Sequence, residues 1–264
     1  MALVRRGYGC TDVGRRRAVN EDAFLVDDEL GLYVVADGMG GHSSGEIASN
    51  EAIETLHNMV RREKAALTAV ESLSNDPPLP GGSRRPVTMR RALRILESAV
   101  QHATYMVFGM AENHPERRGM GTTLTVLFLR GDFALTAQVG DSRVYRVRDG
   151  AAEQITEDHT LIAWQLKRGL ITPEQAQKSQ QKNIITRAVG SRDYVQVDTN
   201  CVPVEPGDAY LLCSDGLHGY LEANEIADVM KLGPEIATKC LIDLANTRGG
   251  TDNITSVAVQ LSIE

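Results

Sequence analysis

The sequence predicts an α+β fold in which β-sheets are covered by helices, and two observations support this prediction. Segments with the pattern of β-strands occur in groups along the chain, and helical segments separate the groups. Because each strand and helix must cover its apolar face with another element, this grouping favours layers of sheet and helix. The chain has 264 residues, so we expect one domain spanning 1–264 with a substantial core.

The predicted strands are short segments rich in alternation of apolar and polar residues. They lie at 22–27, 32–37, 122–130, 133–140, 143–148, 209–214 and 254–261. The predicted helices begin near Gly45, after Thr88 as an N-cap, at Thr172-Pro173 and at Pro234. The first two are long, reaching about Val70 and Met110, and carry apolar residues at steps of three and four. The last two begin at proline, which suits the first helical turn.

Four aspartates lie where an apolar strand ends or begins, each beside Gly, Ser or Asn: Asp37, Asp141, Asp215 and Asp252. A carboxylate at a strand end lies at the rim of a sheet, where hard oxygen ligands can converge on Mg²⁺ or Mn²⁺. The alternative is an ordinary turn, since Asp and Gly both tolerate tight-turn backbone. After Asp37, however, the glycine-rich stretch Gly38-Met-Gly-Gly-His42 is too long for a two-residue hairpin. The four aspartates together therefore favour a divalent metal site.

Composition excludes some functions. The net charge of −7 argues against binding of nucleic acid, because such proteins carry a basic face. The four cysteines show no Cys-x-x-Cys spacing, which is typical of reduced, intracellular thiols. Because the sequence has neither a signal peptide nor an apolar run long enough to span a membrane, we expect a cytoplasmic protein without membrane contact.

Seven short motifs then occur in a specific order along the chain. They are Arg-x-x-Asn-Glu-Asp (17–22), Ala-Asp-Gly-Met-Gly-Gly-His (36–42), Gly-Met-Gly-Thr-Thr-Leu (119–124), Val-Gly-Asp-Ser-Arg-Val-Tyr (139–145), Ile-Thr-Arg-Ala-Val-Gly (185–190), Cys-Ser-Asp-Gly-Leu (213–217) and Thr-Asp-Asn-Ile-Thr (251–255). This series resembles the bacterial form of the metal-dependent serine/threonine protein phosphatases of type 2C, the PPM family. The resemblance covers roughly residues 8–260, and the ordered set is far more specific than any one motif.

The resemblance implies a four-layer α-β-β-α sandwich, in which two packed antiparallel β-sheets are flanked by helix pairs. It also implies hydrolysis of phosphoserine and phosphothreonine in proteins by a metal-activated water, with two to three Mn²⁺ or Mg²⁺ ions. The expected partners are phosphoproteins, with a bacterial serine/threonine kinase and its substrates among them. We expect a monomer that consists of the catalytic domain alone.

The resemblance assigns roles to individual residues. The implied metal ligands are Glu21, Asp37, the Gly38 carbonyl, Asp141, Asp215 and Asp252. Asp37 would bridge two ions, and Asp141 would join Asp215 at a third, weaker site. Arg17 matches the phosphate-binding arginine, whereas Arg16 is expected to face elsewhere along an extended segment. Three residues are expected to contact the ligands rather than the ions: Asp22, Asn253 and Thr123. For Asp22 the alternative is that it binds the first ion directly or through its waters.

Two departures from the family pattern concern the substrate side of the site. The expected flap, residues 155–190, has Ser179-Gln-Gln-Lys-Asn183 where bacterial relatives often have His-Pro-x-Arg-Asn, which puts flap contacts with substrate in question. Met39 replaces the histidine proposed as general acid in eukaryotic relatives, and methionine cannot donate a proton. His42 and His159 are candidate donors, but a lone histidine near a glycine loop is more often structural, so we assign neither.

A Pro/Gly/Arg-rich connector near 72–87 separates the two long helices. It is either a solvated linker or a docking surface for an acidic or phosphorylated partner. Two other functions stay open for the whole chain. One is a pseudophosphatase that binds phosphoproteins, although no metal carboxylate is missing; the other is a phosphomonoesterase for small molecules on the same metal centre.

Overall fold

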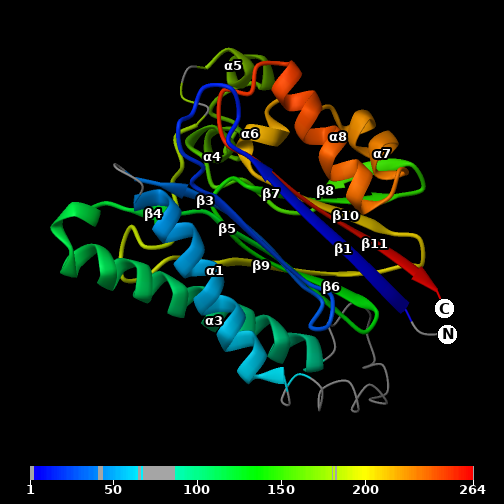
Figure 1. Cartoon of the computed structure of the whole chain (residues 1–264), viewed down its shortest axis with the longest axis horizontal. Helices are drawn as coiled ribbons and strands as arrows, with labels where there is room; N and C mark the ends of the chain where they lie inside the picture. The colour runs from blue at the N-terminus through cyan, green and yellow to red at the C-terminus, as the bar shows by residue number, and fades with distance from the viewer. Residues whose placement is uncertain are drawn as a thin grey trace.

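Two antiparallel β-sheets pack face to face, and helices cover their outer faces (Figure 1). The structure is a computed structural model that describes residues 3–40, 44–64, 67, 87–179, 181 and 183–263. The first sheet has the spatial order β1 (Leu3–Asp12), β11 (Ile254–Ile263), β10 (Ala209–Cys213), β7 (Arg143–Arg148) and β8 (Ala151–Gln154). The second has the order β2 (Asp22–Asp27), β3 (Leu32–Met39), β5 (Leu124–Arg130), β6 (Phe133–Val139) and β9 (Asp198–Pro203), with β4 (Gly121–Thr122) paired to β3.

A pair of helices covers each sheet. Helices α1 (Ser44–Arg62) and α3 (Val87–Asn113) pack on the second sheet, and α7 (Ala223–Met230) and α8 (Pro234–Thr247) pack on the first. The remaining helices are short: α4 (Leu161–Lys167), α5 (Pro173–Lys178), α6 (Asp215–His218) and the 3-10 helix η1 (Pro115–Arg117). The predicted four-layer α-β-β-α sandwich is therefore confirmed.

Three apolar layers hold these elements together. Alternate residues of a strand face opposite sides of its sheet, so Val34 packs under α1 and α3 while Val35 packs between the sheets. Tyr33 and Tyr210, from different sheets, are both fully buried in the layer between the sheets. Burying a large apolar side chain contributes roughly 1.5–3 kcal/mol, so this central layer fixes one sheet on the other.

Most predicted strands agree with the structure, but not all. The prediction at 143–148 matches β7, whereas the one at 122–130 is divided into β4 and β5. The division falls at Thr123, whose backbone N–H donates to the Asp37 carbonyl at 2.9 Å. Three strands, β1, β8 and β9, were not predicted.

The helix predictions also need correction. Helices α5 and α8 begin at the predicted prolines, and Thr172 caps α5. The described part of α3 already includes Val87, so Thr88 is not its N-cap. Helices α4, α6 and α7 were not predicted. The predicted end of the first long helix near Val70, and the predicted connector near 72–87 up to residue 86, lie outside the described residues.

Two further findings concern the cysteines and the search for a membrane-spanning helix. All four cysteines are free thiols. In the part of the chain that the structure describes, no helix combines the length and apolar character needed to cross a bilayer.

Candidate metal centre

The predicted acidic residues come together at one end of the sandwich. Asp37 lies near the end of β3 in one sheet, while Asp215 follows β10 and Asp252 precedes β11 in the other. Asp141 lies on the turn that joins β6 to β7, and so passes from one sheet to the other. A cleft of about 290 Å³ is lined by Arg17, Glu21, Asp37, Gly38, Met39, Gly40, Thr123, Asp141, Asn183, Ile185, Asp215 and Asp252.

Thr123 fixes the backbone of Asp37. Its Oγ1 accepts a hydrogen bond from the Asp37 N–H at 2.8 Å, and its own N–H donates to the Asp37 carbonyl. The Thr122 hydroxyl donates to the same carbonyl at 2.9 Å. Because these contacts satisfy the Asp37 backbone, its carboxylate is left to face the cleft.

Glu21 is held by the first two turns of α1. The Gly45 N–H donates to Glu21 Oε1 at 3.1 Å, and the Ser49 hydroxyl donates to the Glu21 carbonyl at 2.7 Å. A helix N-terminus favours such an anion, since its first N–H groups have no partner within the helix. Glycine is needed here, because a Cβ on Gly45 would lie 2.5 Å from Glu21 Oε1 and one on Gly38 would lie 2.1 Å from the Gly45 carbonyl oxygen.

Asp22 and Asn253 lie behind the cleft rather than in its lining. Asp22 Oδ2 accepts hydrogen bonds from Ser214 Oγ at 2.8 Å and Thr255 Oγ1 at 2.7 Å, so it joins the two sheets. Burial raises the pKa of Asp22 to about 7. Asn253 Oδ1 accepts the N–H of Glu21 at 2.9 Å. The sequence analysis did not single out Ser214 or Thr255, although each is next to or near a predicted aspartate.

Arg17 lies at the rim of the cleft and contacts Asp252. Its Nη2 donates to Asp252 Oδ2 at 2.7 Å, and its side chain is half exposed. This hydrogen bond raises the pKa of Arg17 above its usual value. Arg16 is exposed and does not line the cleft, but the segment 14–16 forms a turn, so the expected extended conformation was wrong.

Crowded carboxylates dominate the electrostatics. Burial, followed by repulsion from Asp22 and Asp215, raises the pKa of Asp37 well above its usual range. Burial and Asp215 raise the pKa of Asp141 to about 7, and burial and Asp252 raise that of Asp215. In each case burial and the neighbouring carboxylates disfavour the ionised form of the side chain.

The donor set fits hard divalent cations. Asp215 Oδ1 and Asp22 Oδ1 are buried without a hydrogen-bond partner, and carboxylate and carbonyl oxygens are what Mg²⁺ and Mn²⁺ prefer. Among the residues that the structure describes, no three acidic, histidine or cysteine side chains already stand at metal-holding spacing. Arg17 Nη2 donates to Asp252 Oδ2, and the Gly45 N–H donates to Glu21 Oε1.

Two residues of the predicted flap belong to the lining of the candidate cleft. Asn183 and Ile185 line the cleft, and an adjoining cleft of about 590 Å³ is walled by α4 and α5 on one side and by Asp215 and Tyr220 on the other. Bridges from Thr160 to Ile185 and from Thr122 to Val189 close the base of the flap.

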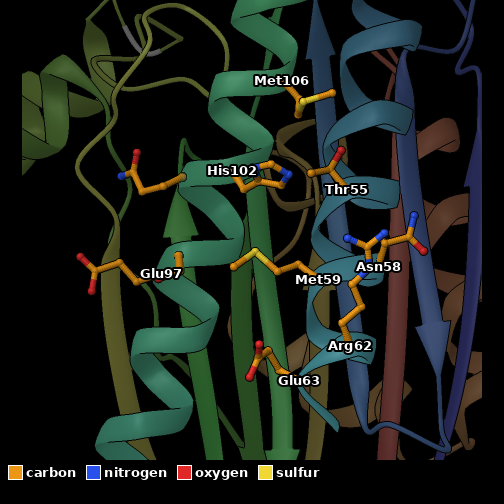
Figure 2. A pocket seen from close by; sticks show the side chains of 10 residues that line it. Thr55, Asn58, Met59, Arg62, Glu63, Glu97, His102 and Met106 are labelled. Atoms are coloured by element: carbon orange, nitrogen blue, oxygen red, sulfur yellow. The ribbon is translucent and has the colours of Figure 1, made fainter. Parts of the chain in front are cut away.

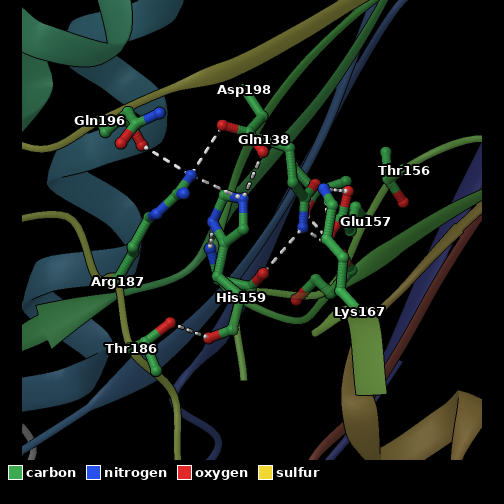
Figure 3. A network of polar contacts seen from close by, with 12 residues as sticks. Gln138, Thr156, Glu157, His159, Lys167, Thr186, Arg187, Gln196 and Asp198 are labelled. Atoms are coloured by element: carbon green, nitrogen blue, oxygen red, sulfur yellow. Dashed lines mark hydrogen bonds and ion pairs between the residues drawn. The ribbon is translucent and has the colours of Figure 1, made fainter. Parts of the chain in front are cut away.

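The structure describes only one of the two histidines considered as proton donors, His159 and not His42. His159 is buried, lines neither cleft, and lies within a network of polar contacts at the flap base (Figure 3). This position makes it a structural residue rather than a donor to a leaving group. His42 lies outside the described residues.

The cavity between α1 and α3 is larger but lacks the predicted chemistry. It has a volume of about 830 Å³, and Figure 2 shows its lining side chains, among them His102, Glu97, Arg62 and Met59. None of the predicted site residues lines it. The cleft at the end of the sandwich is therefore the candidate site.

Carboxylates that converge from two sheets define a class of proteins with a divalent-metal site, and metal-dependent phosphatases are one kind of this class. The chain belongs to the protein phosphatase 2C family, whose model matches residues 11–242. It is 35% identical over 258 residues to the serine/threonine phosphatase stp of Listeria welshimeri, covering 96% of this chain and 94% of that protein. It is also 35% identical to protein phosphatase PhpP of Streptococcus pneumoniae, covering 96% of each.

Solved structures agree with these relatives. The catalytic domain of serine/threonine protein phosphatase PstP, in complex with two manganese ions, has a TM-score of 0.80 and 32% identity, covering 99% of this chain and 100% of that one. The Mycobacterium tuberculosis phosphatase PstP/Ppp has a TM-score of 0.80 at 34% identity and covers 98% and 100%. This chain is therefore a serine/threonine protein phosphatase that depends on divalent metal and acts on phosphoproteins.

Proposed function

We propose that the cleft at the end of the sandwich is the active site, with Asp37 at its centre. Asp37, the Gly38 carbonyl and Glu21 would hold one ion, and Asp37, Asp215 and Asp252 would hold a second. Asp141 and Asp215 would hold a third, weaker ion. The observation that carries this proposal is the meeting of carboxylates from both sheets in one cleft, with raised pKa values and with Arg17 at the rim.

When bound, a pair of divalent ions lowers the pKa of a water and neutralises phosphate oxygens. The protein's own part is to hold its carboxylates where those ions bind. The hydrogen bonds of Thr123 fix Asp37, and the N–H of Gly45 orients Glu21. Asp22 stays behind the cleft as the link between Ser214 and Thr255, and so supports both sheets.

Arg17 is proposed to bind the phosphate of the substrate. A guanidinium offers five N–H donors and can grip two phosphate oxygens at once. In the structure one of its nitrogens contacts Asp252, and the half-exposed side chain leaves the other donors accessible from the cleft mouth. The substrate phosphate would thus lie between Arg17 and the metal ligands.

The cellular setting is also a proposal. By similarity to bacterial serine/threonine phosphatases, the chain would reverse the action of a serine/threonine kinase on that kinase and its substrates. A cytoplasmic location is supported by the four free cysteines, because disulfides are rare in that compartment. The predicted monomer also remains a proposal.

The experiment that tests the active site is metal removal and restoration. Protein stripped with EDTA should not hydrolyse a phosphothreonine peptide, and Mn²⁺ or Mg²⁺ should restore turnover because the metal provides the nucleophile. Undiminished turnover in excess chelator would contradict the proposal. A phosphotyrosine peptide is the control for the type of phosphorylated residue. p-Nitrophenyl phosphate is the control for substrate size, since a preference for this small ester over phosphothreonine would favour a small-molecule phosphomonoesterase.

A further inference from the structure

The cavity between α1 and α3 has two chemically different ends. Figure 2 shows Met106 with Thr55 toward one end and Arg62 with Glu63 toward the other. Met106 is exposed although it is apolar, and Met59 lies between the two ends. The volume of about 830 Å³ lies in the range of roughly 300–1,000 Å³ that ligand sites occupy. The cavity therefore offers an apolar surface at one end and a charged surface at the other.

Arginines of α3 extend the charged end. Arg94 precedes the lining residue Glu97 by three positions, and residues three or four apart lie on the same face of a helix. Arg90 and Arg91 precede Arg94 by four and three positions. All three are exposed, as is Arg62 on α1. We call Arg62, Arg90, Arg91 and Arg94 the basic face.

The charge of the basic face is not neutralised by its neighbours. Among the residues that the structure describes, no ion pair joins these four arginines to an acidic side chain. Glu63 and Glu97 line the cavity, so four arginines against two glutamates leave an excess of positive charge on a chain with a net charge of −7. Arg61, one position from Arg62, interacts instead with Asp27 and Glu29. Unpaired guanidinium groups bind carboxylates or phosphates through two parallel hydrogen bonds.

We propose that the cavity between α1 and α3 is a docking site for an acidic segment of the phosphoprotein substrate, apart from the phosphorylated residue itself. Acidic side chains of that segment contact the basic face, and an apolar side chain packs on Met59 and Met106, because methionine adapts to different partners. The proposal rests on the proposed function only in taking phosphoproteins as the substrates of the metal cleft. Docking raises the effective concentration of the phosphorylated residue at that cleft.

Helix α1 sets the distance between the two sites. Its Gly45 contacts Glu21 at the metal cleft, and Arg62 is its last residue. At a rise of 1.5 Å per residue these two positions lie about 25 Å apart. A flexible linker of about twenty residues has a root-mean-square length of about 25 Å, whereas a linker of about three residues reaches only about 10 Å when fully extended. The acidic segment and the phosphorylated residue must therefore be well separated in the substrate.

Binding is tested first with a probe that carries no phosphate, so that the result does not depend on catalysis. The probe is a fluorescein-labelled peptide of glutamate and leucine residues, and anisotropy measures its binding. Wild type should bind it saturably, and added NaCl should weaken binding because salt screens exposed charges. The same peptide with lysine in place of glutamate should not bind.

Two variants with equal changes in net charge test the location. The basic-face variant combines Arg62→Gln, Arg91→Gln and Arg94→Gln. The control variant combines Arg6→Gln, Arg61→Gln and Lys231→Gln. All six side chains are exposed, and glutamine is a good helix former, so both variants should fold. The basic-face variant should bind the probe about tenfold more weakly, as expected for the loss of three exposed ion pairs, and the control variant should stay within about twofold of wild type.

Methyl NMR of the methionines locates the probe on the wild-type protein without any variant. The signals of Met59 and Met106 should shift when the probe binds, because both line the cavity. The signal of Met230 should not shift, since Met230 is buried between the first sheet and its own helices.

Linked substrates then test the contribution to turnover. A phosphothreonine peptide joined to the acidic segment through about twenty Gly/Ser residues should have a KM about tenfold lower than the same peptide with glutamine in place of glutamate, with kcat unchanged. A linker of about three residues should give no such advantage. The basic-face variant should lose the advantage and still hydrolyse the unlinked phosphothreonine peptide like wild type.

The inference is overturned if the probe does not bind saturably, if the two variants bind it equally, if the Met59 and Met106 signals do not shift, or if the long linker gives no advantage. Self-association of wild type that displaces the probe would also overturn it, because the occupant would then be a second copy of the chain. The proposed function fails separately, and only if wild type with Mn²⁺ or Mg²⁺ does not hydrolyse the unlinked phosphothreonine peptide.

Discussion

Replacing Arg17 with alanine should separate phosphate binding from metal binding. The variant loses a charge-assisted contact to the substrate phosphate, which should cost about 2–4 kcal/mol of transition-state stabilisation, or roughly thirty- to a thousand-fold in kcat/KM. In the free protein the variant loses only the Arg17–Asp252 ion pair, whose side chains are 50% and 31% exposed. Such a pair contributes about 0–1 kcal/mol.

The same structure fixes the expected effect on metal affinity. Because Arg17 and a cation compete for the Asp252 carboxylate, Arg17→Ala should leave Mn²⁺ affinity unchanged or tighten it by at most about fivefold, the equivalent of 1 kcal/mol. Asp252→Ala should instead weaken Mn²⁺ binding. Calorimetric titration with Mn²⁺ and steady-state kinetics on a phosphothreonine peptide would measure both quantities.

Arg16→Ala is the matched control, because Arg16 is exposed one position away and does not line the cleft. It should change kcat/KM by less than about threefold, as expected for a surface charge outside the site. The reasoning is refuted if Arg17→Ala and Arg16→Ala have equal kcat/KM, or if Arg17→Ala loses Mn²⁺ affinity as Asp252→Ala does.

Three further predictions follow from the same contacts. Asp37→Ala and Asp215→Ala should each lower kcat by at least about a hundredfold and weaken Mn²⁺ binding, since carboxylates are the main ligands; full activity in either variant would remove that residue from the centre. Thr123→Val leaves the Asp37 N–H without its acceptor and should lower the free energy of unfolding by about 1–3 kcal/mol, whereas Thr123→Ser should come close to wild type in urea denaturation. In EDTA, the free energy of unfolding should fall as pH rises from about 4 to about 7. The reason is that Asp22 and Asp141, with pKa values of about 7, bind more protons in the folded than in the unfolded protein. Mn²⁺ should reduce this dependence of stability on pH, and a dependence of opposite sign would contradict the charge assignment.

Local patterns in the sequence predicted the elements whose signal lies within themselves. The alternating strand at 143–148 and the proline-started helices α5 and α8 were found because pattern and start signal are both local. Strand β1 was missed because Gly7 and Gly9 interrupt its pattern. The structure explains them: a Cβ on Gly7 would lie 2.6 Å from Tyr33 and one on Gly9 would lie 2.3 Å from Phe24, so rings of the other sheet fill that space.

Edge position explains the other missed strands. β9 (Asp198–Pro203) contains Asp, Thr and Asn and ends in proline, a composition that is tolerated at the edge of a sheet. Strand β9 pairs with β6 although the sequence of β9 alone does not predict a strand. Such strands form because a neighbour is already in place, so single-sequence patterns cannot find them.

For the site, the sequence by itself determined the family, the identity of the acidic residues and their positions at strand ends. Tertiary structure alone decided that those strand ends meet. Asp37 and Asp252 are 215 positions apart in the chain, and only the packing of the two sheets brings both into one cleft with Arg17. It also decided which residues stand behind them, such as Ser214, Thr255 and His218. Their contacts span 77 or more positions, and hydrogen bonding at such separation depends on how the layers pack, not on any local pattern.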